Sequence, residues 1–262
     1  MDLGLRGRVA MVAAGSKGLG RAIAAALVAE GARVSICARS AGPLGETEQA
    51  LRAAGGDVLA VAVDVSQPDE LARWHAATVE RFGAPALLVT NTGGPPPGLF
   101  EELTEDAWRA GIDAALMNVV RMSRLVLPAM HAAKYGRIVH LTSFVAKQPM
   151  ALLTISSTLR AGLSALTKTM GSQVAADGIT VNAVLPGHFA TDRQIELNDI
   201  KARQHGITRA AWEDRVKAEI PARRFGRPEE FGDLVAFLLS ERAGYLNGTS
   251  LQIDGGLTAG TF

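Results

Sequence analysis

Residues 9–24 of the chain read VAMVAAGSKGLGRAIA, an apolar run followed by a glycine-rich turn and the start of an alanine-rich segment. Glycine tolerates positive φ and has no side chain, so backbone N–H groups can close around an anion at the positive end of the next helix. The stretch therefore predicts a strand, a phosphate-binding turn and a helix. A glycine cluster alone also fits tight packing between strand and helix, so the rest of the chain must decide.

The strand and helix pattern of this stretch repeats along the chain. Further strands are predicted over residues 33–38, 58–63, 86–90, 137–142, 179–185 and 249–254, and helices over 21–30, 44–54, 68–82, 104–133, 152–176 and 228–240. The strands are continuously apolar, which is typical of parallel strands covered by helices on both faces. Alternating strands and helices with short loops predict an α/β fold, a doubly wound, Rossmann-like parallel sheet of about seven strands.

One segment departs from this pattern. Residues 191–224 are charged, helical in pattern and poor in large apolar side chains, which suits a mobile cover over a site better than a core layer. No repeat or low-complexity linker divides the chain. We therefore expect residues 1–262 to form one dinucleotide-binding domain, with a helical substrate cover at about 191–224.

Composition and charge narrow the classes of partner. The 27 basic and 26 acidic residues give a net charge of +1, so the chain has no electrostatic footprint for nucleic acid. No apolar run has the length of a membrane span or the form of a secretory signal, so a cytoplasmic protein without membrane contact is expected. The single cysteine, Cys37, lies in an apolar run. We expect a small buried hydrophobe there rather than a reactive thiol, and neither an intrachain disulfide nor a cysteine-based metal site.

A series of short motifs accompanies the predicted strands. They are AAGSKGLG at 13–20, Asp64 with Val65, NTGG at 91–94, Asn118, Ser143, Pro186 with Gly187, Thr191, and NGTSLQIDGG at 247–256. Together they resemble the short-chain dehydrogenase/reductase family, and its 3-oxoacyl-acyl-carrier-protein reductases in particular, over essentially the whole chain. The resemblance implies a small-molecule substrate. It also implies a homodimer or homotetramer, assembled through two long helices and the final strand.

The resemblance also assigns a cofactor site residue by residue. It implies contacts to a nicotinamide cofactor from Gly15, Ser16, Lys17, Gly18, Leu19, Gly20, Asp64, Val65, Asn91, Thr92, Gly93, Pro186, Gly187 and Thr191. Thr191 is expected to bond the nicotinamide carboxamide, with plain helix capping as the alternative. Lys17 and Arg39 stand where relatives select the cofactor, and no acid lies between residues 34 and 40. NADP(H) is therefore expected in preference to NAD(H), unless both cations are simply solvated.

The glycine turn departs from the family pattern at two positions. Ala13 and Ala14 stand where relatives usually have threonine and glycine. The methyl group of Ala14 is expected near the phosphate path. Its cost is small if the φ angle of Ala14 is negative, but it can also shift the turn.

The family's catalytic residues are present only in part. Asn118 and Ser143 match the residues that organise a water chain and orient the carbonyl. The proton-transferring tyrosine and the lysine four positions later correspond to Ser156 and Arg160 in this chain. Arg160 keeps a positive charge and a donor fork suited to the ribose hydroxyls of the cofactor. A serine hydroxyl, in contrast, is a far weaker acid than a phenol.

Five other residues could in principle supply the proton that a catalytic tyrosine would donate. Tyr135 and Tyr245 are the only tyrosines, and relatives often fill both positions with structural aromatic residues. Lys147 lies four residues after Ser143 and His188 follows Gly187, so each is a candidate donor, with a solvated cation and loop packing as the alternatives. His140 lies inside a predicted strand, where a core role is expected.

Two functions fit these residues. The first is an NADP(H)-dependent oxidoreductase that acts on a small carbonyl or alcohol through a non-standard proton relay. The alternative is a protein that binds NADP(H) without redox turnover, as a sensor or as a partner of active relatives. Non-redox chemistry, as in dehalogenating relatives with arginine at the lysine position, fits less well. Those relatives keep the tyrosine and lose the nucleotide turn.

Overall fold

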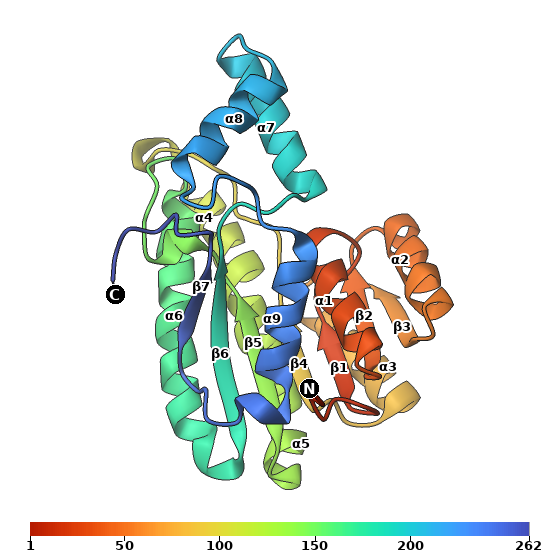
Figure 1. Cartoon of the computed structure of the whole chain (residues 1–262). Helices are drawn as coiled ribbons and strands as arrows, with labels where there is room; N and C mark the ends of the chain where they lie inside the picture. Colours follow the sequence, from red (N-terminus) through yellow and green to blue (C-terminus); the bar gives the residue numbers. More distant parts are fainter. Residues whose placement is uncertain (262) are drawn as a thin grey trace.

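A parallel sheet of seven strands, in the order β3-β2-β1-β4-β5-β6-β7, runs through residues 1–261, the part of the chain that this computed structural model describes (Figure 1). The strands are β1 (Val9–Val12), β2 (Arg33–Ala38), β3 (Asp57–Ala62), β4 (Leu87–Thr90), β5 (Gly136–Leu141), β6 (Ile179–Pro186) and β7 (Ser250–Ile253). The strand order reverses between β1 and β4, and open α/β sheets bind ligands at such a switch point. The doubly wound fold is confirmed.

Helices cover both faces of this sheet (Figure 1). One face carries α1 (Gly18–Ala29), α2 (Ala41–Ala53) and α9 (Pro228–Leu239), and the other carries α3 (Pro68–Phe82), α5 (Asn118–Ala133) and α6 (Thr154–Val174). Each face has its own buried apolar cluster, one including Ile23 and Phe231 and the other including Trp74 and Val174. Apolar strands between two helical layers explain why no strand alternates in polarity.

Each predicted strand is present, but the long helical region predicted over 104–133 is interrupted. The chain forms α4 (Glu105–Ile112), then a π-helical turn, η2 (Asp113–Met117), and then α5. Such turns are often found at functional sites. Short 3-10 helices complete the fold, namely η1 (Phe100–Glu102), η3 (Phe144–Ala146), η4 (Ala175–Asp177) and η5 (Glu241–Ala243).

The helices of the predicted cover, α7 (Asp192–Gln204) and α8 (Arg209–Glu219), project beyond the carboxyl ends of the strands (Figure 1). Their helical pattern is confirmed, and the mobility of this segment stays a prediction. Among the described residues, no helix combines the length and apolar character that crossing a bilayer requires.

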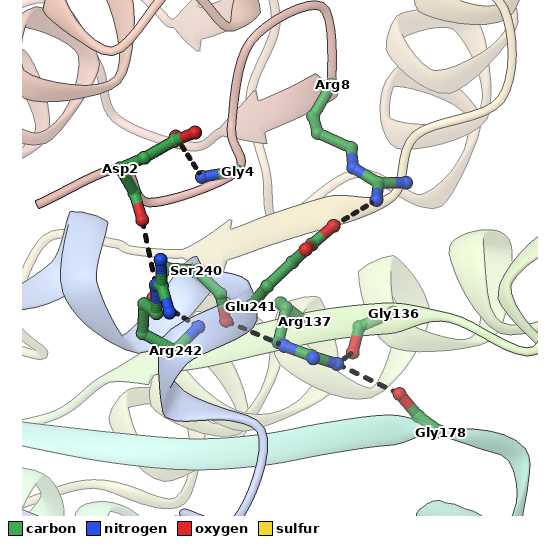
Figure 2. Close-up of polar contacts among 9 residues, drawn as sticks. All are labelled: Asp2, Gly4, Arg8, Gly136, Arg137, Gly178, Ser240, Glu241 and Arg242. Carbon is green, nitrogen blue, oxygen red and sulfur yellow. Dashed lines mark hydrogen bonds and ion pairs between the residues drawn. The ribbon is translucent and has the colours of Figure 1, made fainter.

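At the opposite, amino-terminal edge of the sheet, Arg137 of β5 joins three backbone segments (Figure 2). Its Nε donates to the carbonyl oxygen of Ser240 at 3.1 Å, and its Nη1 donates to the carbonyls of Gly136 at 2.8 Å and Gly178 at 2.9 Å. One buried guanidinium therefore ties β5 to the turn before β6 and to the end of α9.

Three side chains surround this guanidinium, and together with Arg137 they form what we call the Arg137 cluster: Arg8, Tyr135 and Glu241. Arg8 pairs with Glu241 at 2.6 Å, as Figure 2 shows. The guanidinium carbons of Arg8 and Arg137 lie over the ring of Tyr135, at 4.1 and 4.5 Å from its centroid. Tyr135 is therefore a structural residue of this edge, as expected.

Candidate cofactor and active site

The glycine turn joins β1 to α1 at the carboxyl edge of the sheet. Lys17 is the residue before the helix and α1 begins at Gly18. The first N–H groups of a helix have no partner within it, so they are available to an anion. A Cβ on Gly20 would lie 2.1 Å from the carbonyl oxygen of Ala14 and 3.1 Å from Nδ2 of Asn91. Only glycine fits there, and Asn91 lies against the turn.

The backbone of Ala14 is in the left-handed region, with a φ angle of 51°. The methyl group of Ala14 would cost little only at a negative φ, and that condition is not met. A residue with a Cβ in this conformation costs about 1–2 kcal/mol relative to the right-handed region. The turn therefore holds strain at a position where relatives place glycine.

A hollow of about 330 Å³ opens beside the turn, at the carboxyl ends of β1 to β4. Its lining consists of Ala14, Ser16, Ala38, Arg39, Ser40, Val63, Asp64, Val65, Ser66, Thr92, Gly93, Gly94 and Ala114. The structure thus brings together residues expected from the turn, from the ends of β2 and β3, and from the segment after β4. Arg39 is exposed at this hollow, where its charge can meet an anion.

Asp64 is oriented and kept ionised by its neighbours. Its carboxylate accepts hydrogen bonds from the backbone N–H of Ser66 at 2.9 Å and from the Ser66 hydroxyl at 2.8 Å. The Ser66 N–H, with smaller contributions from the hydroxyl and from Arg39, holds the pKa of Asp64 below its usual value. The backbone N–H of Asp64 donates to Glu70 at 2.6 Å. The loop after β3 is therefore fixed from both sides.

The π-helical turn η2 connects this hollow to α5. Thr92 Oγ1 donates to the carbonyl of Ala114 at 2.8 Å. Arg121 donates to Asp113 at 2.8 Å and to the carbonyl of Ser66 at 3.1 Å. The sequence analysis missed Ala114 and Ser66. Ser66 follows Asp64 at the spacing of an Asx turn and was detectable, whereas nothing in the residue pattern announces a π turn.

Asn118 begins α5 directly after this π turn and is fully buried. Its Oδ1 accepts the backbone N–H of Val119 at 2.6 Å. Its Nδ2 has no hydrogen-bond partner among residues 1–261. A buried donor of this kind is where a bound water or a ligand atom is expected.

Ser143 follows the end of β5, and Arg160 reaches this end from α6. The Nη1 of Arg160 donates to the carbonyls of Thr142 at 2.8 Å and Leu141 at 3.4 Å, and its Nε donates to the hydroxyl of Ser156 at 3.2 Å. Ser156 is 8% exposed and Arg160 is 6% exposed. Burial lowers the pKa of Arg160 to about 10, so the side chain stays positively charged at neutral pH.

The loop after β6 carries Pro186, Gly187 and Thr191. The hydroxyl of Thr191 accepts the backbone N–H of Gln194 at 3.3 Å and so caps α7. Its Cγ2 lies 3.4 Å from where a Cβ on Gly18 would stand, so Thr191 lies against the glycine turn. The helix-capping role is confirmed, and a contact to the cofactor stays a prediction.

Two of the candidate proton donors have partners in the protein. The Nζ of Lys147 donates to Gln252 Oε1 at 3.1 Å. His188 Nδ1 lies 3.0 Å from Gln194 Oε1, and its ring centroid is 5.7 Å from that of Phe144. These contacts support a loop-packing role for His188.

The burial of His140, Cys37 and Tyr245 bears on the roles expected for them. His140 is fully buried, its Nδ1 lies 2.9 Å from Thr167 Oγ1, and burial lowers its pKa to about 4. The core role expected for His140 is confirmed. Cys37 is fully buried, and burial raises the pKa of its thiol, as expected of a small core residue. Tyr245 is fully exposed.

Comparisons with known proteins agree with this geometry. A family described as enoyl-(acyl carrier protein) reductase matches residues 13–258. The 3-oxoacyl-[acyl-carrier-protein] reductase of Pseudomonas aeruginosa is 31% identical over 255 residues, which cover 97% of this chain and 99% of that protein. L-Sorbose reductase from Gluconobacter frateurii, solved with NADPH and L-sorbose, superposes with a TM-score of 0.95 at 32% identity, covering 99% of this chain and 100% of that one. An actinorhodin polyketide ketoreductase solved with NADPH gives 0.92 at 33% identity, with 97% and 98% covered.

Proposed function

Because the chain belongs to the short-chain dehydrogenase/reductase family, we propose that it is an NADP(H)-dependent oxidoreductase acting on a small carbonyl or alcohol substrate. The hollow at the strand switch point, continuous with the strained glycine turn, is the observation that carries this proposal. L-Sorbose reductase and the actinorhodin ketoreductase, both solved with NADPH, support the choice of cofactor.

The residues present fit a dinucleotide phosphate. In the proposal the adenosine occupies the hollow beside Asp64, the pyrophosphate lies on the first turn of α1, and the cations of Lys17 and Arg39 pair with the 2′-phosphate. Asp64 is the only carboxylate among the residues that line the hollow, and its Oδ1 already accepts two hydrogen bonds from Ser66. When bound, the cofactor supplies the hydride. The nicotinamide half is proposed to lie between Asn91, Gly187 and Thr191.

The proposed proton relay is non-standard. Ser143 orients the substrate carbonyl, and a water bound at the unpaired Nδ2 of Asn118 is the proposed start of the proton path. Ser156 cannot replace a phenol as an acid. General acid catalysis is worth about 10²–10⁴ in rate, so its loss slows carbonyl reduction without preventing hydride transfer.

One observation favours the alternative, a protein that binds NADP(H) without turnover. Ser156 and Arg160 are hydrogen-bonded to each other at 3.2 Å, so the pair that stands at the family's tyrosine and lysine positions is engaged within the protein. Turnover decides between the two functions, because both require cofactor binding.

The proposal is tested by cofactor titration followed by NADPH oxidation with a panel of carbonyl compounds. We expect tighter binding of NADPH than of NADH, and cofactor oxidation faster than in buffer with at least one carbonyl. Tight binding without turnover on any carbonyl or alcohol would support the alternative, a protein that binds NADP(H) without redox turnover. Gly20→Ala should abolish binding because its Cβ meets the Ala14 carbonyl, whereas Gly45→Ala, with no atom within 4 Å of the new Cβ, is the matched control.

We also propose that α7 and α8 close over the substrate and that the chain forms a homodimer or homotetramer. Exposed Ala161, Gly162 and Ala165 on one side of α6 let a second helix approach closely. Sedimentation equilibrium tests the assembly, and a monomer at micromolar concentration would contradict it.

A further inference from the structure

Two buried arginines of this chain make similar hydrogen bonds. Arg137 and Arg160 are each 6% exposed. Each donates through Nε and Nη1 to three oxygen atoms of the protein, and the Nη2 of each makes no hydrogen bond within residues 1–261. The number of hydrogen bonds therefore does not distinguish the two arginines. They differ in how the positive charge of each is compensated.

The charge of Arg137 is partly compensated within the protein. The electron-rich face of Tyr135 lies 4.5 Å from its guanidinium carbon. Tyr135 and the carboxylate of Glu241, which itself pairs with Arg8, oppose the effect of burial on the pKa of Arg137, while the charge of Arg8 acts in the other direction. A cation with a carboxylate and an aromatic face nearby needs no ligand.

Arg160 has neither kind of compensation. Within residues 1–261, no carboxylate forms an ion pair with Arg160, and burial is the one cause acting on its pKa. Its partners are two backbone carbonyls and the neutral hydroxyl of Ser156. An uncompensated buried charge costs several kcal/mol. The fold nevertheless retains the cation of Arg160 without a counter-charge.

The position of Arg160 indicates where the counter-charge comes from. Its Nη1 lies on the carbonyl of Thr142, the residue before Ser143, at the carboxyl edge where open α/β sheets bind their ligands. The ribose hydroxyls of a cofactor are neutral, and an oxidised nicotinamide ring is itself positive. Neither offsets the charge of Arg160, so the reacting partner must.

We propose that Arg160 binds a carboxylate of the substrate through Nη2, so that the carbonyl compounds accepted by this site are oxo acids. This inference rests on the proposed function and narrows its substrate class. The carboxylate takes the free edge of the guanidinium, and the neighbouring carbonyl of the oxo acid then lies toward Ser143. Charge-assisted hydrogen bonds to a carboxylate give the site its preference for the acid over its ester.

The test measures binding, which does not require turnover. Short 2-oxo and 3-oxo acids and their methyl esters are titrated by calorimetry into the protein saturated with NADP⁺. We expect the acids to bind about 10- to 100-fold more tightly than the esters, the equivalent of the ~1.5–3 kcal/mol typical of hydrogen bonds to charged groups. Arg160→Met should reduce this ratio to about 1, and Arg160→Lys should keep part of it.

Lys147→Met is the matched control, because it removes a cation of the loop after Ser143 and leaves Arg160 in place, and the ratio should persist in it. Equal affinities for acid and ester, binding of neither, or a preference that survives Arg160→Met would overturn the inference. Failure of the proposed function has a different signature. The acid preference then remains while NADPH is not oxidised with any of these compounds.

Discussion

The two ends of β5 hold two buried arginines with opposite roles. At the amino end, Arg137 joins three backbone segments (Figure 2), and Tyr135 and Glu241 oppose the effect of burial on its pKa. At the carboxyl end, Arg160 binds backbone carbonyls and Ser156 without a carboxylate. Burial and hydrogen-bond number are the same, so neither reveals function. What differs is how each charge is compensated, and our proposal that Arg160 binds substrate rests on that difference.

The largest effect is expected from placing a tyrosine and a lysine at the two positions where the family resemblance predicts them. Ser156→Tyr with Arg160→Lys supplies a phenol beside a cation, and we expect carbonyl reduction by NADPH to rise about 10²–10⁴-fold. NADPH oxidation at saturating cofactor measures it. The same double variant carrying Ser143→Ala is the control and should lose the gain. No gain would show that this end of the sheet differs from active relatives in more than these two side chains.

The next test exchanges each arginine for methionine. Arg137→Met leaves three backbone carbonyls without their donor, and we expect the free energy of unfolding to fall by about 3–5 kcal/mol, since each buried group left unsatisfied costs about 1–3 kcal/mol. Arg160→Met removes an uncompensated charge from the interior, so its loss should not exceed about 1 kcal/mol. Urea unfolding measures both variants. Equal losses would mean that Arg160 is as structural as Arg137.

Much of this arrangement was predictable from the sequence. Continuous apolar runs such as 33–38 and 179–185 can only be buried between helical layers, and the turn at 15–20 requires glycine where Gly20 meets Ala14. Because parallel strands end at one edge, Asp64 and Ser143 had to lie on the same side of the sheet. Local patterns therefore determined the fold and the edge that holds the site.

The rest depends on side-chain contacts between distant segments. Nothing local shows that Arg160 reaches the Thr142 carbonyl, 18 positions away, or that its charge lacks a partner. The π turn that brings Ala114 to the hollow has no residue pattern of its own. The positive φ of Ala14 follows from the path of the turn rather than from a preference of alanine. These features require coordinates.

His140 lies in β5 between these two ends, and its burial makes the free energy of unfolding depend on pH. Burial lowers its pKa in the folded protein to about 4, whereas in the unfolded chain it is about 6.5. As pH falls below about 6.5 the unfolded state takes up the proton first, so stability present at neutral pH is lost between about 6.5 and 4. The loss attributable to His140 is about 3 kcal/mol at most.

Unfolding free energies measured from pH 7 to pH 4 test this expectation for His140. His140→Leu should flatten the dependence over this range, since it removes the one group that must stay neutral in this strand. His205→Gln, at an exposed histidine, is the matched control and should keep the slope. An unchanged slope in His140→Leu would contradict the prediction. Another group that titrates between pH 4 and pH 7 would then have to account for the slope.

The smallest expected effect concerns the backbone at the carboxyl edge. Turns beside the Arg137 cluster place Gly7, Gly178 and Lys134 at positive φ, and the nucleotide turn places Ala14 there at 51°. Ala14→Gly relieves about 1–2 kcal/mol of strain and makes the unfolded chain more flexible by about 0.4–1 kcal/mol, so a net gain of about 0.5–1 kcal/mol in unfolding free energy is expected. Ala13→Gly, at a buried position outside the positive-φ residues, should lose stability instead. If both variants lose stability, the positive φ of Ala14 does not lower the free energy of unfolding, and the prediction is wrong.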